Sequence, residues 1–93
     1  NEAYPNHNYI NIHLLLADIY SKNTIWEKVV SECERAIKID GKSLAAHKIL
    51  SVAYYNMQNY KLAEKTLSQT LILDPNDQGA KDLLAKISNK IKQ

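Results

Sequence analysis

The sequence predicts an all-α fold in which five helices, joined by short turns, form a stack of antiparallel pairs. Only two glycines and two prolines occur among the 93 residues, and no segment alternates apolar and polar residues as a β-strand does. Apolar residues instead recur at intervals of three and four, the spacing that places them on one face of a helix. A large part of the chain also superimposes on itself at an offset of 34 residues. These three observations predict that helices alone form the core.

The composition is that of one folded, soluble domain. The apolar fraction of 45% and the charged fraction of 24% are near the averages for globular proteins, which excludes a disordered or fibrous chain. The formal charge of +2 is too small to predict a nucleic-acid partner. No run approaches the ~18 apolar residues of a spanning helix, so we expect no insertion into a membrane.

Cysteine usage and the first residue bear on the context of the chain. Cys33 is the only cysteine, so no internal disulfide forms, and a reducing compartment such as the cytoplasm is mildly favoured. The chain begins at Asn1 without an initiator methionine, which is compatible with a fragment of a longer protein.

The first two helices are predicted from their apolar spacing and their end signals. The first runs from about Asn6 to Lys22, and its expected inward residues are Ile12, Leu15, Leu16, Ile19 and Tyr20. The second begins with a capping-box pattern, in which the Thr24 side chain accepts the Glu27 amide and Glu27 reaches back to the Thr24 amide. Its apolar stripe comprises Trp26, Val29, Val30, Cys33, Ala36 and Ile37. We expect Gly41 to follow this helix in the left-handed conformation.

The last three helices carry similar signals. Ser43 and Asn59 are placed to cap the third and fourth, and Asp74-Pro75-Asn76-Asp77 separates the fourth from the fifth, which runs from Gln78 to about Ile91. The inward residues expected on the third are Leu44, His47, Leu50, Ser51 and Tyr54. Those on the fourth are Tyr60, Ala63, Leu67, Thr70 and Leu71, and those on the fifth are Leu83, Leu84, Ile87 and Ile91.

The offset of 34 residues pairs like with like. His13 meets His47, Leu16 meets Leu50, Tyr20 meets Tyr54, Trp26 meets Tyr60, and Asp40 meets Asp74. This pattern resembles the tetratricopeptide repeat family, whose 34-residue unit asks for a large residue, Leu-small, Tyr, Ala, a bulky residue, Ala and Pro. Residues 44–77 match through Leu50-Ser51, Tyr54, Tyr60, Ala63, Leu67 and Pro75. Residues 10–43 match through Leu16-Ala17, Tyr20, Trp26 and Ala36, with Val29, Cys33 and Gly41 at the remaining slots.

The resemblance implies a right-handed α-solenoid made of two repeats and a capping helix. The whole chain, 1–93, is then one domain, with repeats at 10–43 and 44–77 and a polar end helix at 78–93. The helices are expected to cross at their small residues, which are Ala17, Ala36, Ser51 and Ala63.

The resemblance also implies a site, because the first helix of each repeat lines a concave groove in this family. The groove-facing residues would be Asn11, Leu14, Leu15, Asp18, Lys22, Lys48, Ile49, Val52, Tyr55, Asn56 and Lys86, with Leu83 and Lys90 beside them. The apolar members either receive a peptide segment or partner helix, or contact neighbouring helices, and the sequence leaves both interpretations open.

Within the family, the resemblance is to the last two repeats and end helix of co-chaperones of the immunophilin type. The segment Ser31 to Asp40 and the turn Asp74-Pro75-Asn76 carry it. Those proteins clamp the C-terminal carboxylate of a heat-shock chaperone with Lys, Asn and Arg side chains. The matching slots here hold Leu15, Ala45 and Ile49, so the resemblance implies a module without the carboxylate clamp. Lys48 still offers one positive charge to a ligand.

No residue pattern predicts catalysis, a cofactor or a metal site. His13 and His47 occupy equivalent slots and are expected to be half-buried contact residues, without the further ligands a metal needs. Cys33 is expected in the core, with no base or oxyanion site to make it a nucleophile. Glu32 and Glu34 cannot share a helix face and are expected on the outer surface.

Two further interpretations compete with peptide binding. Tyr9 and Ile12, on the outer side of the first helix, are available for pairing with a second copy of the chain, which predicts a homo-oligomer. Lys81, Lys86, Lys90 and Lys92 either bind an acidic or calmodulin-like partner or form a solvated face of the end helix.

Overall fold

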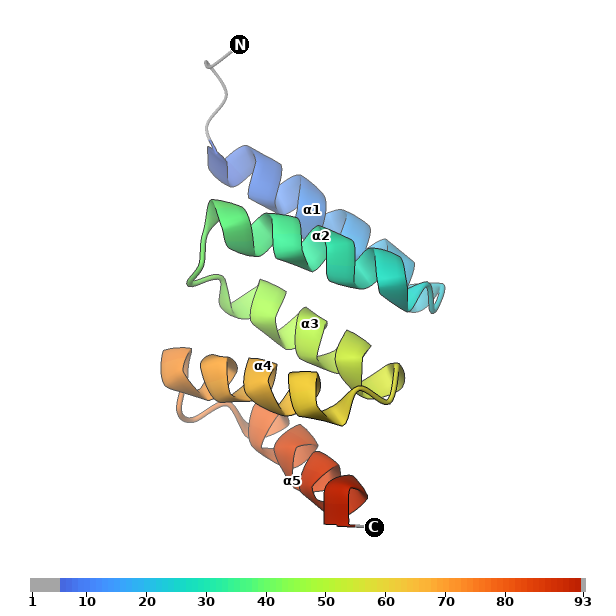
Figure 1. The fold of residues 1–93 in the computed structure, drawn as a ribbon. Coiled ribbons are helices and arrows are strands. Elements are labelled where there is room, and N and C mark those ends of the chain that lie inside the picture. Colours follow the sequence, from blue (N-terminus) through green and yellow to red (C-terminus); the bar gives the residue numbers. More distant parts are fainter. Residues whose placement is uncertain (1–5, 93) are drawn as a thin grey trace.

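The computed structural model of the chain describes residues 6–92, and within them the predicted all-α fold is confirmed (Figure 1). Its helices are α1 (Asn6–Lys22), α2 (Trp26–Ile39), α3 (Leu44–Asn56), α4 (Tyr60–Leu73) and α5 (Gln78–Lys92). No strand occurs in this described range. The predicted helix bounds agree with the observed ones to within a few residues.

Each helix runs antiparallel to the one before it, and the helices form an elongated stack of 51 × 28 × 17 Å. Each packs on its neighbours in the sequence, and α1 also contacts α3. In the view of Figure 1, α2 and α4 lie in front, with α1 behind α2 and α5 behind α4. The stack therefore has one side formed by α2 and α4 and another formed by the odd-numbered helices.

The small residues predicted at the helix contacts are all buried. Ala17, Ala36 and Ala63 are fully buried, and Ser51 is 1% exposed. Large side chains fill the space beside them: Val29, Cys33 and Leu50 pack around Ala17 and Ala53, while Leu67 and Ile87 pack around Ala63 and Ala80. Small residues allow the helix axes to approach, and burying the larger ones supplies the hydrophobic stabilisation of the stack.

The inward face predicted for α1 is partly wrong. Ile12, Leu15 and Ile19 are 51%, 61% and 44% exposed, whereas Ile10 and Ala17 are buried. The residues 34 positions after Ile12 and Ile19 are Ala46 and Ala53, which are buried against α2. No described helix covers the corresponding side of α1, so its apolar residues stay exposed. Ile91, expected to point inward on α5, is likewise 46% exposed.

The turns after α1 and α3 share one geometry, which contradicts the predicted capping box. Thr24 and Gln58 have φ angles of 57° and 63°, in the left-handed region. The amide of Ile25 donates to the Tyr20 carbonyl at 3.0 Å, and that of Asn59 donates to the Tyr54 carbonyl at 2.9 Å. This is the Schellman arrangement, in which the left-handed residue closes the preceding helix. Thr24 therefore terminates α1 instead of capping α2, and its hydroxyl donates to the Asn23 carbonyl.

The longer turns after α2 and α4 depend on aspartate instead of glycine. Gly41 does not adopt a positive φ, contrary to the expectation for it. Asp40 accepts the Lys42 amide through its carboxylate at 3.0 Å, and Asp74 accepts the Asn76 amide at 3.2 Å. These side-chain bonds form the turn without a left-handed residue.

Two of the helix starts have side-chain caps. Ser43 accepts the Ala46 amide at 3.2 Å, as predicted, and Asp77 makes the equivalent bond to the Ala80 amide at 3.0 Å. Asn59 is at the N-cap position of α4, but its side chain makes no capping bond. The caps of α3 and α5 thus repeat at the same 34-residue offset as the core.

Candidate functional site

The odd-numbered helices present a row of exposed side chains on one stripe each. Residues spaced by three and four share a helix face, so Asn11, Leu15, Asp18 and Lys22 align on α1, and Lys48, Val52 and Asn56 align on α3. Lys86 is the exposed member on α5. We call these eight residues the groove face. They combine two aliphatic side chains with amides and charges of both signs.

Three other residues predicted to face the groove are half-buried in helix contacts. Leu14 packs against the buried residues Ala36 and Ala46, and Ile49 packs against the cluster around Ala17. Tyr55 packs against the cluster of α4 and α5, with its ring centroid 5.7 Å from that of Tyr60. The sequence leaves open whether these apolar residues receive a peptide or contact neighbouring helices. For these three residues the structure shows contact with neighbouring helices.

A cavity of about 160 Å³ opens between α3 and α5. Leu67 of α4 lies among its lining residues, and Val52 and Leu83 line it from the two flanking helices. The remaining lining residues are Lys48, Ser51, Gly79 and Ala80. The Ser51 hydroxyl donates to the Lys48 carbonyl at 2.7 Å and is therefore occupied within α3. The cavity thus offers an apolar surface to a guest.

An ion pair lies at this cavity. Lys48 Nζ is 2.8 Å from Asp77 Oδ2, which joins α3 to the residue that caps α5. The hydrogen bond from Lys48, together with the amide of Ala80, holds the pKa of Asp77 below its usual 3.8. The single charge that the sequence offered for a ligand carboxylate is consequently already paired with a carboxylate of the chain itself.

A second polar cluster joins α1 to α2, and it corrects the expectation for Glu32. Glu32 is 6% exposed instead of lying on the outer surface, whereas Glu34 is exposed as expected. One Glu32 oxygen is 2.6 Å from His13 Nδ1, and the other accepts a hydrogen bond from Arg35 at 3.0 Å. The buried carboxylate is therefore satisfied on both oxygens, and the cluster stabilises the helix contact.

The remaining chemically active side chains are also used in packing. His47 is buried, and its Nε2 is 3.0 Å from the Gly41 carbonyl, which ties α3 to the preceding turn. Burial raises the pKa of the Cys33 thiol to about 12, with a smaller contribution from the neighbouring glutamates, so the reactive thiolate is suppressed. Within residues 6–92, no group of His, Cys, Asp or Glu side chains is arranged to hold a metal ion.

Some members of the site were missed by reasoning from the sequence. The sequence predicts Leu67 as a core residue of the fourth helix and gives no signal for Ala80. A cavity between helices depends on how closely the helices approach, which the sequence pattern does not give. Asp77 had a usable signal, since it lies 34 residues after Ser43 and makes the same helix cap.

None of the described helices is long and apolar enough to cross a bilayer.

Turns, caps and core residues that recur at a fixed offset define a helical-repeat protein. A family model described as Tetratricopeptide repeat matches residues 26–87, which is more than half of the chain. The chain therefore belongs to the tetratricopeptide repeat (TPR) family. A comparison with curated protein sequences gives no match.

Solved structures of TPR domains share the fold. The first TPR domain of Spaghetti (RPAP3), bound to the HSP90 peptide SRMEEVD, has a TM-score of 0.89 at 23% identity, covering 92% of this chain and 71% of that one. The second TPR domain of human RPAP3, in complex with the HSP70 peptide SGPTIEEVD, has a TM-score of 0.81 at 24% identity, covering 85% and 66%.

A third similar structure comes from an immunophilin-type protein. The C-terminal TPR-containing domain of a Plasmodium falciparum protein described as FK506-binding has a TM-score of 0.86 at 24% identity, covering 98% of this chain and 66% of that one. At such identities the likeness concerns the fold. This chain spans 66% to 71% of the lengths of these three relatives.

Proposed function

We propose that the chain is a protein-interaction module that binds a peptide segment or partner helix on the groove face. The observation that carries the proposal is the apolar cavity between α3 and α5, flanked by exposed Val52. A partner side chain placed there removes apolar surface from water on both molecules, which favours binding by ~25 cal/mol per Å². Family membership and the peptide-bound TPR neighbours support the same proposal.

The test is to select peptides from a random library displayed on phage against the immobilised chain, and then to titrate the selected peptides in solution. Val52→Asp places a charge at the cavity and is expected to weaken binding about tenfold or more, since one buried aliphatic contact is worth about 1.5 kcal/mol or more. Leu62→Asp is the matched control, because Leu62 on α4 is 39% exposed and Val52 is 40% exposed. Equal loss of binding in both variants, or in neither, would contradict the groove face as the site.

A co-chaperone role would require the chain to bind the C-terminal peptide of a heat-shock chaperone, and this binding is tested separately. The three clamp slots hold Leu15, Ala45 and Ile49, and Lys48 is engaged by Asp77. A chaperone C-terminal carboxylate would therefore lose water without gaining charged donors. We expect the peptide SRMEEVD to bind at least about tenfold more weakly than the selected peptides. Tighter binding that is abolished by amidation of its C-terminus would show that a carboxylate clamp operates.

Self-association is the second candidate function, favoured by the exposed apolar side of α1. Ile12 and Ile19 occupy the positions at which α3 has alanines buried against α2. A helix from a second copy that packs there would cover both isoleucines. Tyr9, the other residue expected at this contact, has a side chain outside the described ones. Sedimentation equilibrium of the wild type and of Ile12→Lys/Ile19→Lys tests the idea, and a wild-type monomer at millimolar concentration contradicts it.

A further inference from the structure

We propose that the groove face recognises an internal peptide segment in which one aliphatic side chain enters the cavity and neighbouring acidic side chains pair with Lys86 and Lys90. A free C-terminal carboxylate is not required. This inference rests on the proposed function and specifies the chemistry of the partner.

The size and lining of the cavity select one aliphatic side chain. An apolar cavity of roughly 150 Å³ holds a benzene-sized guest, and the cavity here measures about 160 Å³. Val52, Leu67 and Leu83 line it with hydrocarbon, and the Ser51 hydroxyl already donates to the Lys48 carbonyl. A leucine, isoleucine or methionine side chain matches this volume and needs no hydrogen bond. A polar guest would lose its hydration without a partner.

The exposed lysines of α5 extend from the cavity along one helix face. At ~100° per residue, Lys86 and Lys90 lie within ~60° of Leu83 around the helix, and Lys90 lies ~10 Å farther along its axis. Lys81 lies on a different side. An extended peptide advances ~3.3 Å per residue, so both ammonium groups are within reach of residues one to three positions from the aliphatic side chain.

The charges of the chain itself leave these two lysines available. Lys22 pairs with Asp18 at 3.4 Å, and Lys48 pairs with Asp77 at 2.8 Å. Neither Lys86 nor Lys90 forms an ion pair with any described residue. Both side chains are exposed. Asp82, one turn before Lys86 on α5, accepts a hydrogen bond from Gln78 at 2.9 Å. Two lysines against this one aspartate leave the exposed stripe of α5 with a net positive charge, which is complementary to acidic side chains.

The same arrangement makes the end of the partner chain irrelevant. The slots that hold the Lys, Asn and Arg donors in clamp-bearing relatives contain Leu15, Ala45 and Ile49 here. Side-chain carboxylates on the partner can reach Lys86 and Lys90 from the middle of a segment as well as from its end. We therefore expect recognition of an acidic segment with an aliphatic anchor anywhere in the sequence of the partner.

The test uses an acetylated and amidated nonapeptide with one central leucine and glutamates on both sides, titrated into the full chain by fluorescence anisotropy. Replacing the leucine by alanine is expected to weaken binding about tenfold. Lys86→Glu/Lys90→Glu is expected to weaken it about tenfold and to strengthen binding of the peptide in which lysines replace the glutamates. The free-acid form of the peptide is expected to bind as well as the amidated form, within about twofold.

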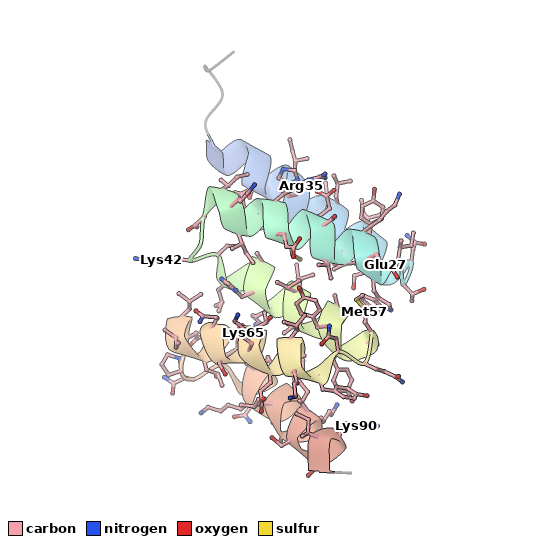
Figure 2. All side chains as sticks on the ribbon, in the orientation of Figure 1. Glu27, Arg35, Lys42, Met57, Lys65 and Lys90 are labelled. Atoms are coloured by element: carbon pink, nitrogen blue, oxygen red, sulfur yellow. The ribbon has the colours of Figure 1, made fainter. Side chains whose placement is uncertain are left out.

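Lys61→Glu/Lys65→Glu is the matched control, because this exposed pair on α4 has the same spacing of four residues. Figure 2 labels Lys65 on α4 and Lys90 on α5. Equal effects of the two double variants, or strong dependence on a free carboxylate, would overturn the inference. If uncharged peptides bind, and Val52→Asp still abolishes their binding, the proposed function stands and only the acidic preference fails. If no library peptide depends on Val52, the proposed function itself fails.

Discussion

Thr24 and Gln58 are the two residues within 6–92 at which the backbone adopts a left-handed conformation. A left-handed conformation costs an ordinary residue roughly 1–2 kcal/mol, and a β-branched residue such as threonine is especially unsuited to it. Both residues close a helix through backbone hydrogen bonds, so the side chain itself is not needed there. Each repeat therefore contains one position at which conformational strain is accepted to make the turn.

We expect Thr24→Gly to stabilise the protein by about 0.5–1 kcal/mol, because glycine occupies the left-handed region without strain. Urea unfolding monitored by circular dichroism measures the change. Glycine at the helical position Ser68, which is exposed, is the control and should destabilise by a similar amount. A loss of stability in Thr24→Gly would show that the turn is not formed as described.

Glu32 is a buried acid, and its two oxygens bind His13 and Arg35. Glu32→Gln removes the negative charge that strengthens both of these hydrogen bonds and is expected to lower the free energy of unfolding by about 1–2 kcal/mol. Glu34→Gln, two residues away and exposed, is expected to change it by less than about 0.5 kcal/mol. Equal values for the two variants in urea unfolding would argue against the cluster.

The Cys33 thiol is expected to resist alkylation in the folded protein, because it is fully buried and its pKa is raised to about 12. At pH 8 nearly all of it remains a protonated thiol, which is a poor nucleophile. Mass spectrometry after iodoacetamide treatment should show modification only in denaturant or at the rate at which α2 opens. Rapid labelling of the native chain would contradict this burial.

At the scale of helices, Asp77 caps α5 and links it to α3 through its ion pair with Lys48. Its pKa is lower in the folded chain than its usual 3.8, chiefly because of the bond to Lys48. A carboxyl group with a depressed folded pKa contributes stability that is complete above the unfolded pKa and is lost as the pH falls through the folded value.

We therefore compare Asp77→Asn, which keeps a capping oxygen and removes the ion pair, with the wild type. The variant is expected to be less stable at pH 7, and the difference should shrink below about pH 4, where the aspartate becomes protonated in the unfolded chain. Urea unfolding at pH 7 and pH 3 measures both values, with Asp82→Asn as the exposed control. A difference that persists unchanged at pH 3 would assign the effect to the cap instead of the ion pair.

The helices were predictable because their apolar spacing and the 34-residue offset reinforce each other. The inward face of α1 was not predictable, since Ile12 and Ile19 have the spacing of core residues but no described helix covers them. Thr24 was assigned to the wrong helix because a threonine in a short turn serves equally as an N-cap or as a C-terminal residue. The cavity was beyond sequence reasoning, since Leu67 and Gly79 meet only through helix geometry.

At the scale of the whole molecule, stacking by contacts between neighbouring helices determines which helix faces stay exposed. Each core cluster joins helices that are close in sequence, and none of these clusters of described residues fills the cavity between α3 and α5. Glu27 at the start of α2 and Met57 after α3 both lie on the right-hand side of the stack in Figure 2. The groove face and the side formed by α2 and α4 are thus separate surfaces of one module.

The most direct measurement for this account is the mapping of amide chemical shifts of the labelled chain during titration with a library-selected peptide. Binding on the groove face predicts that the largest changes cluster at Lys48, Val52, Gly79, Leu83 and Lys86, and that they vanish in Val52→Asp. Amides of α2 and the exposed side of α4, including Leu62 and Lys65, should change little. Changes concentrated on those even-numbered helices, with the α3 and α5 amides unaffected, would contradict the account.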